Sequence, residues 1–287
     1  MFAMKMKHAV LMGLVAVILA GCGQPVAKEP AQNPTAESKG DVDALATTPE
    51  IEALAPSQDA SVLLEASGGL PLWAAQKKLN ARCVVKLYRP DSSFYLTEHD
   101  LVVYPWSNAI RVSASEPRSK FVWQVVDGQY ALSLGDPSLD VSPLAGAYQG
   151  YASAILAIVT VPVRFLDRDA QIHREPTPLR VRGQWYQRFT ATFSPKRVKG
   201  ADGSEMVQPY WSDAVYFMNR GDALVDMIWL GNAERKEFLV VRGYDYSGMT
   251  EEEQGRLRVP SKIEIFRSDA EVTIYERIAE INIKGDE

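Results

Sequence analysis

A series of short β-strand patterns, interrupted by one long uncharged stretch, limits the folds open to this chain. Within the patterns apolar residues alternate with polar ones, and Asp127-Gly128 is a strong two-residue hairpin signal. The expected strands are Arg82–Tyr88, Phe94–Tyr104, Ala109–Ala114, Lys120–Val126, Gln129–Leu134, Pro178–Val181 leading into Trp185–Phe193, Ala214–Met218, Ala223–Leu230, Phe238–Tyr244, Val259–Arg267 and Val272–Ile283. Because they follow one another as hairpins, without a β-α-β rhythm, they predict one antiparallel sheet of about ten or eleven strands.

The interrupting stretch, Leu144–Val161, has large apolar residues at helical spacing, a proline at each end and no charge. Such a helix is buried or lies against another apolar surface, and Gly146 and Gly150 favour close packing on a sheet. A shorter amphipathic helix is expected over Pro71–Leu79, and a polar loop over Lys196–Gln208. We therefore expect an α+β fold, in which a single, strongly curved, unclosed sheet forms a half-barrel and helices cover its concave face.

The first residues have the pattern of an export signal. Lys5 and Lys7 precede an apolar run from Ala9 to Leu19, which is shorter than the roughly 20 residues of a spanning helix. A permanent anchor helix is therefore the weaker alternative. The run closes in Leu19-Ala20-Gly21-Cys22, which resembles the lipobox of bacterial lipoproteins, where the cysteine receives a diacylglycerol and becomes the first residue of the mature chain. The other alternative is an ordinary signal peptide with a chance cysteine.

The lipobox resemblance implies that residues 1–21 are a signal peptide and that lipid on Cys22 holds the protein on a membrane, since two or more acyl chains give stable anchoring. Gly23 stands where an aspartate retains enteric lipoproteins in the inner membrane, so we expect the outer membrane, facing the periplasm. Residues 22–60 have no aromatics and predict a disordered tether with a reach of about 30–40 Å. Residues 61–287 then form one domain.

Composition excludes further classes of function. Without Lys5 and Lys7 the chain has 29 Lys and Arg against 36 Asp and Glu, a net charge of −7. This acidity argues against a nucleic-acid partner, which needs a basic surface. With Cys22 lipidated, Cys83 is the single free thiol, so no intrachain disulfide can form, and its apolar neighbours predict a buried, inert thiol.

The sequence contains no recognisable catalytic or metal-binding string. Glu98-His99-Asp100 places carboxylates beside an imidazole, but adjacent strand residues point to opposite faces, which favours a solvated edge or turn over a metal or acid–base site. His173, in the charged segment Asp167–Glu175, is expected in a surface loop. Asp226 is expected to face outward or to be paired while buried. We expect no enzyme, no metal and no cofactor beyond the lipid on Cys22, with an envelope hydrolase as the minor alternative.

The order of these features resembles the LolA/LolB-like superfamily of bacterial lipoproteins and lipoprotein carriers. The strings that carry the resemblance, in order, are a helix around Trp73, Val161-Pro162-Val163-Arg164-Phe165-Leu166, Val181-Arg182-Gly183-Gln184-Trp185-Tyr186, Ala214-Val215-Tyr216-Phe217 and Leu257-Arg258-Val259-Pro260. The resemblance implies an open, curved antiparallel sheet whose open side is plugged by helices. The chain differs from the soluble carriers in its lipobox and its long tether.

The large side chains of the domain have two interpretations. Core packing is the plainer one, and the functional one is an apolar pocket left between the sheet and the helix. The candidate lining is Phe121, Trp123, Val125, Leu156, Val159, Phe165, Leu166, Phe189 and Phe193. We expect a non-enzymatic, membrane-anchored envelope lipoprotein that binds an acyl chain or another apolar ligand in the half-barrel. The alternative is a structural or scaffolding lipoprotein that binds another envelope protein.

Overall fold

The computed structural model describes residues 46–49, 54, 56–115, 120–126, 129–134, 145–194, 196–199, 205–208, 210–247 and 257–284. For residues 115, 120–126, 129–134, 145–148, 196–199, 205–208 and 247 it describes only the course of the backbone. The chain divides into two units, residues 1–40 and 41–287, and every described residue lies in the second. The predicted signal segment and Cys22 lie outside the described residues.

The described domain contains short helices and many strands. The helices are α1 (Gln58–Ala66), α2 (Leu70–Ala75), α3 (Ala145–Val159) and α4 (Val161–Arg164). The strands are β1 (Leu79–Tyr88), β2 (Phe94–Tyr104), β3 (Ala109–Ser115), β4 (Lys120–Val126), β5 (Gln129–Leu134), β6 (Ala170–Arg174), β7 (Leu179–Val181), β8 (Gln184–Phe193), β9 (Lys196–Lys199), β10 (Glu205–Gln208), β11 (Asp213–Asn219), β12 (Val225–Asn232), β13 (Glu237–Ser247), β14 (Val259–Ser268) and β15 (Ile274–Lys284). No helix in the described part of the chain has the length and hydropathy to cross a membrane.

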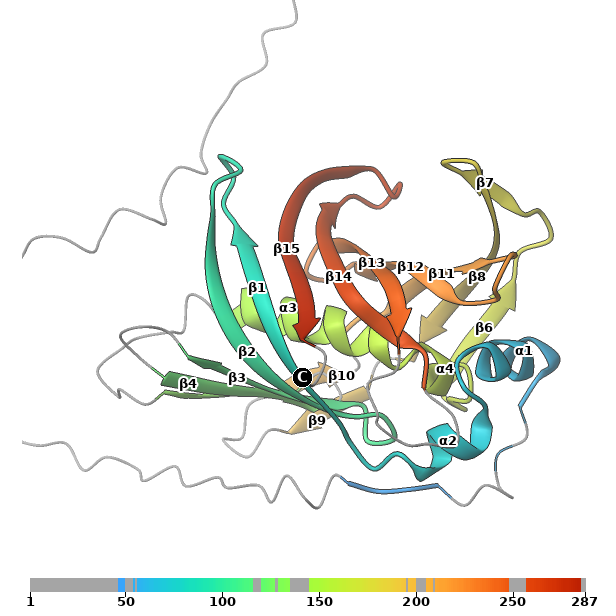
Figure 1. The fold of residues 1–287 in the computed structure, drawn as a ribbon, viewed down its shortest axis with the longest axis horizontal. Coiled ribbons are helices and arrows are strands. Elements are labelled where there is room, and N and C mark those ends of the chain that lie inside the picture. The colour runs from blue at the N-terminus through green and yellow to red at the C-terminus, as the bar shows by residue number, and fades with distance from the viewer. Residues whose placement is uncertain are drawn as a thin grey trace, which may run out of the picture. The chain divides into compact units, whose positions relative to one another are not determined.

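Thirteen strands form one antiparallel sheet, in the order β5-β4-β3-β2-β1-β15-β14-β13-β12-β11-β8-β6 with β7 paired to β8 (Figure 1). The first and last strands meet in its middle, where Cys83 pairs with Ile283 and Val85 with Ile281. The chain therefore builds two meanders: the first runs outward from this seam to the β5 edge, and the second returns from the β6 edge to the seam. Because β5 and β6 are those edges in the described sheet, the predicted unclosed antiparallel sheet is confirmed.

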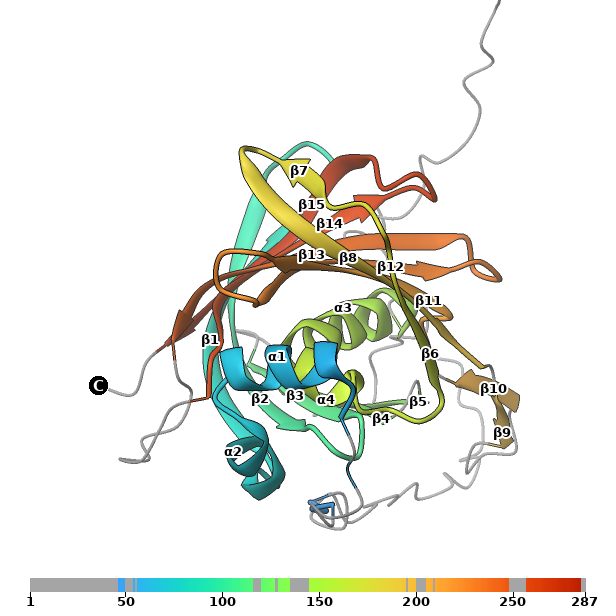
Figure 2. The same cartoon turned by 90° about the vertical axis from the view of Figure 1, so that its right-hand side faces the viewer.

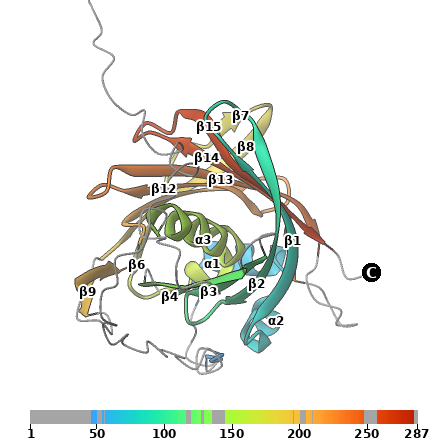
Figure 3. The same ribbon diagram turned by 90° about the vertical axis from the view of Figure 1, so that its left-hand side faces the viewer.

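Helix α3 belongs to the connection that carries the chain from the β5 edge to the β6 edge. It contacts β3, β4 and β5 on one arm of the sheet and β12, β13 and β14 on the other, and it lies inside the curve of the sheet (Figures 2 and 3). A helix enclosed on both sides has no water for charged side chains, which explains its composition. The fit is close at Gly150, where a Cβ would lie 2.5 Å from Oε1 of Glu237. The prediction that a helix covers the concave face is confirmed.

Alternation along the strands places one apolar core on the concave face and a smaller one on the opposite face. In β1 and β14, for example, Val85 and Ile263 are buried in the main core. The smaller core comprises Tyr186, Phe217, Met227, Trp229 and Val240, from β8, β11, β12 and β13. These strands are apolar on both faces, which explains the nearly continuous apolar sequence of Leu224–Leu230.

The described domain begins earlier than predicted. Helix α1 starts at Gln58, before the expected boundary at residue 61. The Ser57 side chain accepts a hydrogen bond from the first turn, and Leu63 and Leu64 are buried on one face. Its apolar stripe follows a polar segment directly and spans too few turns to establish a clear period in the sequence.

Two segments expected to be loops contain strands. Ala170–Arg174 forms β6, which pairs with β8 through Ala170 and Phe193. Because β6 is an edge strand with mostly exposed or partly exposed side chains, its sequence is charged enough to be mistaken for a loop. Within Lys196–Gln208, β9 and β10 pair as a separate two-stranded sheet. The main sheet thus has 13 strands, more than the predicted ten or eleven.

Candidate functional site

The predicted pocket residues lie on the concave side, and the deepest of them are core. Leu156, Val159, Phe165 and Phe189 are buried in the main apolar core. Leu166 and Phe193 are partly buried and pack against that core. The side chains of Phe121, Trp123 and Val125 lie outside the described residues; their backbone forms β4. Whether any of these nine residues binds a ligand stays a prediction.

Phe165 shows how the interior is filled where α4 ends. Its ring centroid lies 5.3 Å from that of Phe189 in β8 and 5.2 Å from that of Tyr216 in β11, both in edge-on arrangements. Edge-to-face packing at such distances is favourable and leaves little space between rings. The cavity that Val159 lines has a volume of about 10 Å³, room for a single water at most. In this described region the concave side is therefore packed.

An open pocket of about 370 Å³ lies beside α4, where the helical crossover emerges from the sheet. Its volume falls at the lower end of the range for small-molecule sites. The lining residues are Pro49, Leu54, Trp106, Val163, Arg164, Leu166, Asp167 and Arg168. Of the predicted lining residues with described side chains, Leu166 lines this pocket.

Several contacts fix the walls of this pocket, which we call the α4 pocket. The indole Nε1 of Trp106, in the turn between β2 and β3, donates to the carbonyl of Trp73 at 3.0 Å. Arg164 donates to the carbonyl of Pro105 at 2.7 Å and to the Asp167 carboxylate at 3.3 Å. The arginine is thus held at the pocket, next to apolar walls. An apolar wall beside a positioned cation suits an amphiphile with an anionic or carboxyl end.

The sequence contained partial signals for the α4 pocket. Pro162 was expected to stop the long helix, but it lies in the first turn of α4, where its fixed φ is favourable. This restart places Val163 and Leu166 at the pocket. Trp106 was not among the predicted pocket residues, because nothing local in a turn sequence shows which helix a side chain will face.

His99 corrects the prediction of a solvated edge or turn. It is buried in β2, its Nδ1 lies 3.1 Å from the Tyr151 hydroxyl of α3, and the two rings meet edge-on. Burial lowers the pKa of His99 to about 4. Glu98 and Asp100 are exposed, as alternation requires, so the three residues do not form one site. The imidazole points inward because His99 alternates in phase with the buried Leu101 and Val103 of β2, which is an interior strand flanked by β1 and β3.

Cys83 pairs with His99 across β1 and β2, and both side chains point inward. Burial, followed by the charge of Asp100, raises the pKa of the Cys83 thiol to about 12. The thiol therefore stays protonated at neutral pH and is a poor nucleophile. The prediction of a buried thiol is confirmed.

The remaining polar candidates do not assemble a catalytic centre. His173 is exposed in β6, where it pairs with Thr190 of β8, and the Thr190 hydroxyl donates to the His173 carbonyl at 3.5 Å. Asp226 is partly buried and accepts a hydrogen bond from the Tyr186 hydroxyl at 3.2 Å, and burial raises its pKa to about 6. In the part of the chain that the structure covers, no three His, Cys, Asp or Glu side chains are placed to hold a metal ion.

No family model and no curated protein matches the chain. Its fold is similar to solved structures at low identity. A LolA superfamily protein from Nitrosomonas europaea has a TM-score of 0.46 and 10% identity, over 80% of this chain and 92% of that one. An outer membrane lipoprotein-sorting protein domain from Vibrio parahaemolyticus has a TM-score of 0.41 and 8% identity, over 72% and 83% of the two chains. A DUF1329 family protein from Desulfovibrio piger has a TM-score of 0.40 and 8% identity, over 83% and 92%. These likenesses concern the fold alone, and the strand order itself establishes the open half-barrel.

Proposed function

We propose that this chain is a non-enzymatic envelope lipoprotein, anchored through lipid on Cys22, that binds an acyl chain or a similar apolar chain at the α4 pocket of its half-barrel. The observation that carries this proposal is the α4 pocket itself, with its apolar walls and its positioned arginine. The sequence supports the anchor through its lipobox, and the outer membrane is the expected location.

The division between packed interior and open pocket supports the choice of ligand. Deep in the half-barrel, Phe165 and Phe189 fill the space that a ligand would need. At the α4 end, the partly buried side chains of Trp106 and Leu166 line an open pocket. Transferring an alkyl chain from water to such a surface gains roughly 0.8 kcal/mol per buried methylene. Because association costs roughly 4 kcal/mol or more in lost translational and rotational freedom, burial of about ten methylenes is needed to reach millimolar affinity.

The segment that leads from the predicted lipidation site forms part of the same pocket. Pro49 and Leu54 line it, and the Thr47 hydroxyl lies 3.2 Å from that of Ser107, next to Trp106 in the chain. A bound chain would therefore touch the end of the predicted tether. We propose that ligand binding and the position of this segment are coupled.

Displacement of a dansyl-labelled fatty acid by palmitic acid tests the proposal on the chain from Gly23 onward. Leu166→Trp would narrow the α4 pocket with a bulky ring, and Val62→Trp, at an exposed position of α1, is the matched control. We expect wild type and Val62→Trp to bind alike and Leu166→Trp to bind about tenfold more weakly or worse. Equal binding by all three, with Leu166→Trp shown to be folded by circular dichroism, would reject the α4 pocket as the site.

One observation favours the scaffolding alternative. The hairpins β1–β2 and β14–β15 are neighbours, and their loops lie at the same end of the sheet (Figure 1). They include the exposed apolar residues Phe94, Tyr95, Leu96, Ile274 and Tyr275. Exposed apolar residues on neighbouring hairpins are what a contact surface would need. A photo-crosslinking residue at Tyr275 would capture one defined envelope protein in intact cells if this alternative holds, and no protein if it does not.

A further inference from the structure

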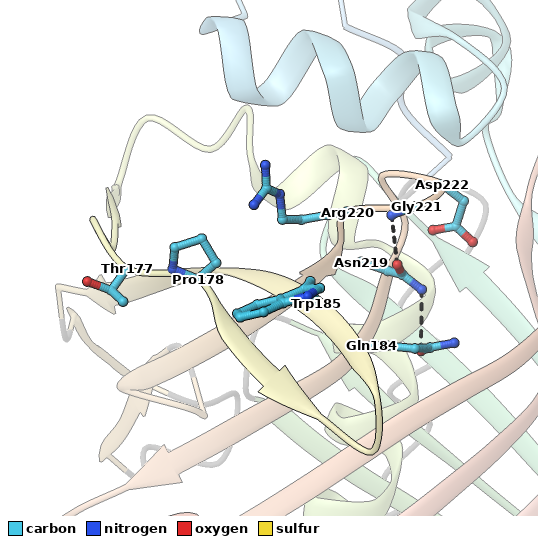
Figure 4. Close-up of a pocket in the computed structure, with 8 residues that line it drawn as sticks. All are labelled: Thr177, Pro178, Gln184, Trp185, Asn219, Arg220, Gly221 and Asp222. Atoms are coloured by element: carbon cyan, nitrogen blue, oxygen red, sulfur yellow. Dashed lines mark hydrogen bonds between the residues drawn. The ribbon is translucent and has the colours of Figure 1, made fainter.

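A second pocket, of about 980 Å³, lies around Trp185 and is separate from the α4 pocket. It is open to solvent, between the β7–β8 hairpin and the turn that joins β11 to β12 (Figure 4). We call it the Trp185 pocket. Thr177, Gln184, Asn219, Arg220 and Asp222 line it together with the tryptophan. It shares no lining residue with the α4 pocket, so the proposed acyl site does not include it.

Backbone contacts hold the two walls together. The amide of Arg220 donates to the carbonyl of Trp185 at 2.9 Å, which joins the turn to the hairpin. The turn is closed by the amide of Asn219, which donates to the carbonyl of Leu224 at 2.8 Å, and by the Asn219 side chain, which accepts from Gly221 at 2.9 Å. Such a turn holds its shape without a ligand, so the pocket is largely formed in advance.

Trp185 provides a flat apolar platform. Its side chain is 51% exposed, while the next residue, Tyr186, is buried in the smaller core. The guanidinium of Arg180 lies 6.0 Å from the indole centroid, a cation–π contact that helps to fix the ring. A large aromatic that a well-paired strand leaves exposed beside a pocket is typical of a contact surface.

The polar groups around the platform include donors and acceptors. Gln184 Oε1 accepts from the Tyr186 hydroxyl at 2.8 Å, which orients the amide. Asp222 Oδ1 accepts from the Leu224 amide at 3.1 Å. Among the contacts between described residues, Nε2 of Gln184, Oδ2 of Asp222 and the guanidinium of Arg220 have no hydrogen-bond or ion-pair partner. The pocket thus offers an oriented amide and carboxylate, together with an unpaired guanidinium, to a ligand.

We propose that the Trp185 pocket binds a pyranose ring of a glycan. One face of a pyranose presents C–H groups that pack on an indole, and the hydroxyls around its edge both donate and accept hydrogen bonds. Gln184, Asp222 and Arg220 match those hydroxyls with both kinds of partner. An anionic bilayer surface would match the arginines but would oppose the Asp222 carboxylate, which makes it the poorer occupant.

Co-sedimentation with purified, insoluble peptidoglycan and titration calorimetry with a soluble β-1,4-linked N-acetylglucosamine oligomer test this proposal on the chain from Gly23 onward. Trp185→Ala should weaken binding to both glycans by about tenfold or more, as the loss of one stacking contact does. Arg220→Gln should weaken it less. Val62→Ala, which removes an apolar side chain exposed elsewhere, on α1, is the control and should bind as wild type does.

Three results would overturn the proposal. One is that wild type binds neither peptidoglycan nor the N-acetylglucosamine oligomer. A second is that Trp185→Ala binds these glycans as tightly as wild type does. The third is binding to phosphatidylglycerol vesicles, lost in Trp185→Ala, without any binding to the glycans, which would assign the pocket to a lipid surface. Because Trp185 and Arg220 are exposed, both variants should keep the unfolding midpoint of wild type, and circular dichroism checks this.

Discussion

His99 should make the stability of this protein depend on pH below neutrality. The imidazole is buried between β2 and α3, with the Tyr151 hydroxyl 3.1 Å from Nδ1 and the protonated thiol of Cys83 on the neighbouring strand. Neither group carries a charge that would stabilise an imidazolium at this pH. Protonation in the folded state would therefore place a charge at a buried position, which burial disfavours.

The sign and size of the effect follow from the pKa. Burial lowers the pKa of His99 from 6.5 to about 4. Above pH 6.5 neither state binds the proton, so the histidine contributes its full stability. As the pH falls from 6.5 towards 4, the unfolded chain binds a proton that the folded chain does not, and the free energy of unfolding falls. At about 1.4 kcal/mol per pKa unit, the loss is roughly 3 kcal/mol.

Urea denaturation between pH 7.5 and pH 4, followed by circular dichroism, measures this loss. His99→Gln keeps a hydrogen-bonding group for Tyr151 but cannot be charged, so its stability should fall with acid by roughly 3 kcal/mol less than that of wild type. His173→Gln, at an exposed position of β6, is the matched control and should follow wild type. The carboxylates shared by all three proteins cancel in the comparison. Parallel profiles for His99→Gln and wild type would refute the reasoning.

Three further substitutions have expected outcomes. In Gly243→Ala the new Cβ would lie 2.9 Å from Cβ of Pro260, so thermal unfolding should show a loss of about 1–3 kcal/mol. Asp226→Asn should stabilise the protein at pH 8 but not near pH 4. Burial raises the pKa of Asp226 to about 6, so the protonated carboxyl contributes stability that is fully present below pH 3.8 and is lost as the pH rises through 6. A gain in stability that persists near pH 4 would argue against this. Arg174→Ala breaks an exposed 2.8 Å ion pair to Asp59, and urea denaturation should show a change below about 1 kcal/mol.

The alternation of apolar residues was sufficient to predict the antiparallel half-barrel and its central helix. The residues of α3 were decisive, since an uncharged helix within a β-domain has to be enclosed by the sheet. The central pairing of β1 with β15 could not be predicted, because partners such as Cys83 and Ile283 are 200 residues apart in the chain and alternation specifies faces rather than neighbours.

The site was harder to predict than the fold. Periodicity showed that Leu156 and Phe189 share apolar faces, but only packing decides whether such a face is filled, and these two residues are buried in the core. His99 was misplaced because flanking charges suggested an edge, while its strand lies in the interior of the sheet. The open pockets depend on turns such as the one at Trp106, whose contacts come from distant segments.

The central claim is that this half-barrel holds an apolar chain at the α4 pocket. Native mass spectrometry of the chain from Gly23 onward, expressed without lipidation, purified without detergent and supplied with excess palmitic acid, tests it most directly. The account predicts one bound palmitic acid on the wild-type protein and a much smaller bound fraction on Leu166→Trp. Wild-type protein that is folded and carries no apolar molecule under these conditions would contradict the claim.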